Sequence, residues 1–144
     1  MPIYSKPARL AISILIHVAD HEVEHFSTVR EIASETGVSE PTVAKLLQVL
    51  AKEGILESRK GPGGGFRLAH SPADISLLRV VTAVEGGEPL TDCAGGLPNC
   101  SELNPCPLHE KWKGVKAELV RFLEGTSLYE LLAAARRMGR LARG

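Results

Sequence analysis

Apolar residues dominate the segment 5–20, and its polar exceptions recur every four positions. This spacing is close to the 3.6-residue repeat of an α-helix and collects the polar side chains on one stripe. The other faces of the segment are apolar, so we expect a mostly buried helix. The polar stripe consists of Arg9, Ser13, His17 and His21.

Two shorter helices are predicted next. Thr28 and Glu31 have the spacing of a capping box, which indicates the start of a helix, and Gly37 is expected to end it. Ser39 is placed to cap a third helix, with Pro41 in its first turn. Apolar residues in this third helix recur at i, i+3, i+4 and i+7, which predicts one buried stripe made of Val43, Leu46, Leu47 and Leu50.

A β-hairpin is predicted after the third helix. Residues 55–59 and 66–68 have strand character, and the glycine-rich loop 61–65 joins them. Further helices are expected over 75–84, over 108–123 and from a capping box at residues 127–130 to the C-terminal arginines. Two short helices joined by a tight turn and followed by a hairpin predict a mainly α fold, a winged helix-turn-helix with a β-hairpin wing.

Composition limits the class of protein. The 144 residues are 44% hydrophobic and 24% charged, which is typical of a globular chain, and the formal net charge is zero. No apolar run approaches the ~20 residues that span a bilayer, and the N-terminus lacks a signal-peptide layout. We therefore expect a cytoplasmic protein without a membrane partner. Paired carboxylates, a nucleophile elbow and a phosphate loop are absent from the sequence, so we do not expect an enzyme.

The predicted third helix and hairpin have the residues of a surface that binds double-stranded DNA. Polar side chains near the start of the third helix can reach base edges or phosphates in a major groove. Cations around the glycine loop suit a minor groove or the phosphate backbone. The alternative is a helix-turn-helix that serves only as a packing unit. The residues expected to contact DNA are Ser39, Pro41, Thr42, Lys45, Gln48, Arg59, Lys60 and Arg67.

Three cysteines lie within residues 93–106, an odd and clustered set that favours a metal site or redox chemistry over a disulfide framework. With one histidine they form the pattern Cys93-x6-Cys100-x5-Cys106-x2-His109. Three thiolates and an imidazole fit a tetrahedral zinc site or a 2Fe–2S cluster, and spacing alone does not decide between them. The absence of paired C-x2-C knuckles favours the cluster. A switch based on thiol oxidation is a further alternative.

Residues 29–68, with the G-P-G-G-G loop, and the A-V-E-G segment at 83–86 resemble the Rrf2 family of bacterial transcriptional regulators, which includes IscR, NsrR and RirA. The resemblance implies a homodimer that binds a pseudo-palindromic operator, with Arg59 at the minor-groove position of the wing. It also implies three parts: a DNA-binding domain at 1–86, a cysteine-rich cluster-binding loop at 87–107, and a long dimerisation helix with a C-terminal helix at 108–144.

The resemblance extends to the cysteine loop. IscR-like members bind a 2Fe–2S cluster through three loop cysteines and a histidine three residues beyond the last one, an order that Cys93, Cys100, Cys106 and His109 match. The first gap holds six residues, where five are usual in the family. The resemblance implies a regulator that senses redox, iron or nitric-oxide status, with 2Fe–2S favoured over 4Fe–4S. The alternatives are a cluster-free regulator that uses thiol oxidation or zinc, and an iron–sulfur carrier or electron-transfer protein.

Three histidines, His17, His21 and His25, are spaced four residues apart. The first two lie on the polar stripe of the first predicted helix, and the third falls beyond the end of that helix. We therefore expect exposed or interface residues here rather than a second metal site.

Overall fold

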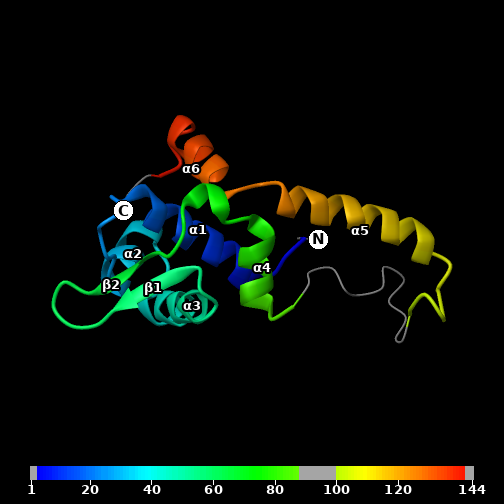
Figure 1. The fold of residues 1–144 in the computed structure, drawn as a ribbon, viewed down its shortest axis with the longest axis horizontal. Coiled ribbons are helices and arrows are strands. Elements are labelled where there is room, and N and C mark those ends of the chain that lie inside the picture. The colour runs from blue at the N-terminus through cyan, green and yellow to red at the C-terminus, as the bar shows by residue number, and fades with distance from the viewer. Residues whose placement is uncertain (1–2, 88–99, 142–144) are drawn as a thin grey trace.

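The structure is a computed structural model that describes residues 3–87 and 100–141. It is mainly α-helical with one two-stranded antiparallel wing, which confirms the predicted fold class (Figure 1). Within the described residues, no helix combines the length and apolar character needed to cross a membrane. The elements are α1 (Lys6–Asp20), α2 (Val29–Thr36), α3 (Glu40–Lys52), β1 (Leu56–Arg59), β2 (Gly65–Leu68), a 3-10 turn η1 (Pro72–Asp74), α4 (Leu77–Glu85), α5 (His109–Glu124) and α6 (Leu128–Arg137).

Helix α1 lies at the centre of the body, where it packs against α2, α3, α4, α6 and β2. Its apolar side chains are buried, as the sequence predicts, and Ile14 and Leu15 are completely so. His17 is also buried, with 7% of its surface exposed, and its Nδ1 lies 2.9 Å from the carbonyl oxygen of Ser13. The expectation that His17 is exposed or at an interface is therefore wrong, because the elements that pack around α1 also cover its polar stripe at this position.

Local capping starts α2 as predicted, whereas α3 begins differently. The Thr28 hydroxyl accepts a hydrogen bond from the Glu31 amide at 3.1 Å, and the Glu31 carboxylate accepts one from the Thr28 amide at 3.4 Å. Gly37 ends α2 with a φ of 76°. Ser39 is the N-cap residue of α3, but its hydroxyl donates to Thr42 Oγ1 at 2.9 Å and makes no capping bond to the helix backbone.

Backbone hydrogen bonds join the wing to the loop before α2. Ser27 and Phe66 exchange two backbone hydrogen bonds, of 2.7 and 2.8 Å, which add a short bridge beside β2. A Cβ atom on Gly65 would lie 2.4 Å from the Ser27 carbonyl oxygen, and one on Gly64 would lie 2.2 Å from the Arg59 carbonyl oxygen. The glycine run of the wing is therefore required by close backbone approaches.

The wing and α5 extend from opposite ends of the body (Figure 1). Helix α5 packs against α4, and its C-terminal Leu123 is completely buried in the core. The chain then turns back into α6, and two backbone hydrogen bonds tie this turn to the start of α4. They run from Leu77 N–H to the Thr126 carbonyl at 2.9 Å and from Leu128 N–H to the Ile75 carbonyl at 2.8 Å. The N-terminal part of α5 is thereby held away from the body.

Replacing Leu47 tests the packing of α3 on the body. This side chain is completely buried, so Leu47→Ala removes apolar contacts and leaves a cavity. We expect the free energy of unfolding to fall by about 2–5 kcal/mol, measured by urea denaturation with far-ultraviolet circular dichroism. Leu103→Ala is the matched control, because Leu103 is 98% exposed, and we expect a change within about 0.5 kcal/mol. Equal stabilities of the two variants would contradict the packing described here.

Candidate functional site

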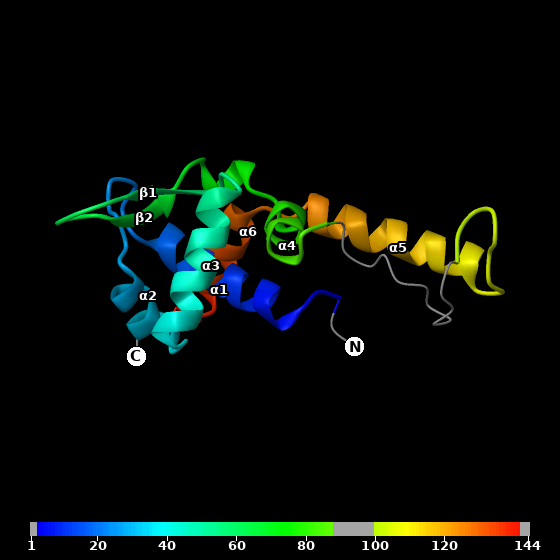
Figure 2. The same cartoon turned by 90° about the horizontal axis from the view of Figure 1, so that it is seen from below.

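The residues predicted to read DNA gather on one side of α3. Its apolar stripe faces the core, which leaves the opposite side at the surface (Figure 2). Pro41, Lys45 and Gln48 are exposed, and Thr42 is half-buried beside them. Exposed Ser39 precedes them at the N-cap. The first turns of α3 therefore present an amide, an ammonium and hydroxyl groups, the donor and acceptor types that contact base edges and phosphates.

The two arginines of the wing both contact the same aromatic ring, that of Phe26. The guanidinium carbons of Arg59 and Arg67 lie 5.5 and 4.4 Å from the centre of the Phe26 ring. Both distances are within the range of a cation–π contact. Phe26 lies in the loop before α2, next to the Ser27 bridge, so it is close to the wing only after the chain has folded. Sequence reasoning missed it because no local pattern links residue 26 to the hairpin.

The wing cations differ in their internal partners. Arg67 hydrogen-bonds to Glu57, which is opposite it in the β1–β2 register, and its Nη1 lies 3.3 Å from Glu24 Oε2. The bond to Glu57, with the charge of Glu24 adding to it, raises the pKa of Arg67 above its usual value. Among the described residues, Arg59 and Lys60 form no ion pair, and both are exposed. The charge of Arg67 is thus compensated within the chain, whereas those of Arg59 and Lys60 are available to a phosphate.

The structure brings together part of the predicted metal-ligand set. Cys93 lies outside the described residues. Cys100 Sγ lies 3.5 Å from His109 Nδ1, and Cys106 is buried, with 8% of its surface exposed. His109 is the first residue of α5, and its amide donates to the Cys106 carbonyl oxygen at 3.0 Å. Helix α5 thus begins where the Cys100 thiol meets the imidazole, three residues after Cys106.

A carboxylate that sequence reasoning missed lies on the other side of the imidazole. Glu102 Oε1 is 3.3 Å from His109 Nε2 and 2.7 Å from the Lys113 ammonium. The hydrogen bond from Lys113, with a smaller one from His109, lowers the pKa of Glu102, and Glu102 in turn raises the pKa of Lys113. A carboxylate therefore lies near Nε2 while Nδ1 faces Cys100, and a carboxylate in this position is common behind metal-binding histidines.

The described donors fit the group that the sequence suggests. Thiolates prefer soft and borderline metals, and a neutral imidazole is a ligand for zinc and for the iron of some clusters. The Cys100–His109 distance shows that a thiol and an imidazole converge without any rearrangement of the chain. The donor chemistry alone suits either a zinc ion or an iron–sulfur cluster.

Comparison with known proteins gives a family for the whole arrangement. The Rrf2 family, described as an iron-dependent transcriptional regulator, matches residues 4–134. The HTH-type transcriptional regulator IscR of Aliivibrio salmonicida is 33% identical over 124 residues, which cover 86% of this chain and 73% of that protein.

Solved structures agree with this result. CymR, the global cysteine regulator of B. subtilis, has a TM-score of 0.77 at 23% identity, over 93% of this chain and 98% of that one. T. potens IscR has a TM-score of 0.72 at 25% identity, over 97% and 92% of the two chains. The chain, with its winged helix-turn-helix and its polar α3 surface, belongs to the Rrf2 family of DNA-binding transcriptional regulators.

Proposed function

We propose that this regulator senses redox, iron or nitric-oxide status through an iron–sulfur cluster held by Cys93, Cys100, Cys106 and His109, with 2Fe–2S favoured over 4Fe–4S. The observation that carries the proposal is the 3.5 Å approach of Cys100 Sγ to His109 Nδ1, beside the buried Cys106. The order of the four ligands and the final three-residue step also match the IscR-like pattern. The described family, an iron-dependent regulator, supports the same reading of the donors.

Each chain residue has a separate task in this proposal. A bound cluster supplies reversible one-electron chemistry. Cys100 and Cys106 would hold the iron as thiolates, and His109 would hold it through Nδ1, with Glu102 close to Nε2. His109 is the first residue of α5. Binding of the cluster by His109 would therefore link the cysteine loop to α5, the helix that leads back to the body.

The second candidate is a regulator of the same family without a cluster. The similarity in fold to CymR, described as a cysteine regulator, favours this alternative, in which the same thiols are oxidised or bind zinc. A carrier or electron-transfer protein would have no use for the exposed cations of the wing. The metal content of the purified protein separates these candidates.

For DNA recognition we propose that the start of α3 enters a major groove while the wing tip follows the backbone or the adjacent minor groove. The exposed Lys45 and Gln48 on α3 and the exposed Arg59 and Lys60 on the wing support this docking. Arg67 keeps a supporting role in our proposal, because Glu57 and Glu24 already neutralise its charge.

We further propose a homodimer formed through α5, with the three parts 1–86, 87–107 and 108–144 as its functional division. Val115 and Phe122 on α5 are each 52% exposed, although both are apolar. They lie on the same side of the helix as Trp112 and Leu119, which are half-buried. An apolar stripe on a helix that stands away from the body is typical of an interface between copies.

Metal analysis of anaerobically purified protein tests the cluster. We expect a coloured protein with about two iron and two acid-labile sulfide per chain, and a colourless one for Cys93→Ala, Cys100→Ala or Cys106→Ala. Glu102→Gln leaves the ligands in place but removes the charge beside the His109 ring. We expect the affinity for the cluster, measured by competition with a chelator, to fall about 10–100-fold. Leu103→Ala, in the same loop and 98% exposed, is the control that keeps its colour. Wild-type protein that stays colourless after reconstitution would overturn the cluster and favour the thiol or zinc switch.

Analytical ultracentrifugation tests the α5 interface. Phe122→Glu places a charge in the apolar stripe, so we expect the dissociation constant of the dimer to rise at least tenfold. Ala117→Glu is the control, since Ala117 is exposed on the opposite side of α5, and we expect no change in mass. A dimer that survives both substitutions would place the interface elsewhere.

Titration of a DNA duplex tests the wing. We expect Arg59→Ala to weaken binding by about 1–3 kcal/mol at fixed salt, on a duplex selected by the wild-type protein from a random pool. Arg137→Ala removes an equal charge from α6, on the exposed side of the C-terminal helix, and is expected to leave affinity unchanged. Equal affinity of Arg59→Ala and wild type would remove Arg59 from the DNA-binding set.

A further inference from the structure

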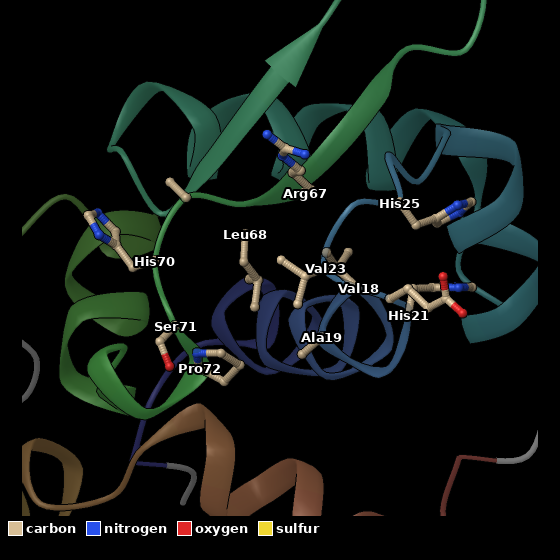
Figure 3. A pocket seen from close by; sticks show the side chains of 12 residues that line it. Val18, Ala19, His21, Val23, His25, Arg67, Leu68, His70, Ser71 and Pro72 are labelled. Atoms are coloured by element: carbon tan, nitrogen blue, oxygen red, sulfur yellow. The ribbon is translucent and has the colours of Figure 1, made fainter.

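A second cluster of metal-binding side chains lies where α1 passes into α2. His21 caps the end of α1, His25 follows in the loop, and Glu31 and Glu35 lie one turn apart on α2. In Figure 3 the rings of His21 and His25 point the same way, away from the apolar side chains of Val18, Ala19 and Leu68. Helix α2 and the start of α5, where His109 lies, are at opposite ends of the molecule (Figure 1).

The donor atoms of this cluster converge. His21 Nε2 lies 2.7 Å from Glu35 Oε1 and 3.6 Å from Glu31 Oε1, and His25 Nε2 lies 2.8 Å from Glu31 Oε1. One ligand atom each from His21, His25 and Glu31 lies within 4.8 Å of the other two, and Glu35 joins this group through its contact with His21 alone. Ligand atoms around a tetrahedral zinc ion, each about 2.0–2.2 Å from the metal, are about 3.3 Å apart. The observed separations lie on both sides of that value.

The surroundings also suit a cation. The side chains of His21 and Glu35 are only 16% and 10% exposed, and that of Glu31 is 30% exposed. Two carboxylates four residues apart on one helix face repel each other, and a divalent ion between them removes that repulsion. Glu31 Oε2 accepts from the Thr28 amide in the capping box and also lies 3.0 Å from His25 Nε2, whereas Oε1 is near both His21 and His25.

We infer that His21, His25 and Glu31, with Glu35 beside His21, form a zinc-binding site, distinct from the cysteine loop. Imidazole and carboxylate donors without a thiolate select a borderline divalent ion over an iron–sulfur cluster. The ion joins the end of α1 to α2, and α2 packs against the DNA-reading α3. Its binding therefore stiffens the helix-turn-helix rather than the sensor loop. The spacing of the histidines does not predict this site, because the two glutamates come close to His21 and His25 only when the loop between α1 and α2 has folded.

The test measures zinc binding in a full-length chain whose thiols have been removed. In the variant Cys93→Ser/Cys100→Ser/Cys106→Ser, Zn²⁺ is titrated against a chelating dye and the bound metal is counted by mass spectrometry. We expect one zinc per chain, and at least a tenfold loss of affinity on adding His21→Ala or His25→Ala. His70→Ala is the matched control, because His70 is exposed on the same pocket but outside the cluster, and we expect it to bind zinc as before.

A stability readout complements the stoichiometry. Because the ion binds the folded chain, a hundredfold excess over its Kd should raise Tm by about 5–10 °C, an increase that His21→Ala abolishes. If the thiol-free chain does not fold, wild-type protein and His21→Ala/His25→Ala are compared instead, and the double variant should bind one zinc fewer. Absence of zinc binding at micromolar concentration, or equal binding after His21→Ala, would overturn the inference. Neither result bears on the cluster, whose ligands are different residues.

Discussion

Burial of α1 is the constraint on which the rest of the structure depends. A helix that is apolar on nearly all sides must be covered on nearly all sides, and elements from both ends of the chain provide that cover. The N-terminal α2 and α3, the strand β2, α4 and the C-terminal α6 all pack on it. The orientation of α3, the proposed DNA-reading helix, and the return of the chain after α5 are consequently set by one core.

The features that short stretches of chain determine could be predicted, and those that join distant stretches could not. Capping boxes, the apolar stripe of α3 and the hairpin of the wing depend on neighbours within a few residues, so their patterns are visible in the sequence. The bond from Arg67 to Glu24 spans 43 residues, and that from Arg136 to Asp20 spans 116. The burial of His17 belongs to the same class, because elements from both ends of the chain pack on α1.

The same distinction holds within the candidate sites. The last step of the ligand pattern, from Cys106 to His109, is a local spacing, and its thiol and imidazole do lie at the start of α5. Glu102 approaches His109 only through the path of the loop, so this contact could not be predicted without the structure. The cluster at α2 shows the limit of spacing arguments most plainly. Histidines four apart predict little until the carboxylates of another helix are brought to them.

In the proposed regulator, the position of α5 determines how a change at the cysteine loop would reach DNA. His109, which we propose as a ligand, is at one end of this 16-residue helix, about 24 Å from the other end at a rise of 1.5 Å per residue. The C-terminal end is fastened in the core, through Leu123 and the turn to α6. Reordering of the loop would then act on the body as a change in the direction of α5, transmitted through α4, against which α5 packs. In the proposed homodimer that direction also sets the separation of the two α3 helices, and a two-fold operator is sensitive to this separation. In this proposal, a sensor at the end of a long helix would need no contact with the DNA-binding surface in order to alter affinity.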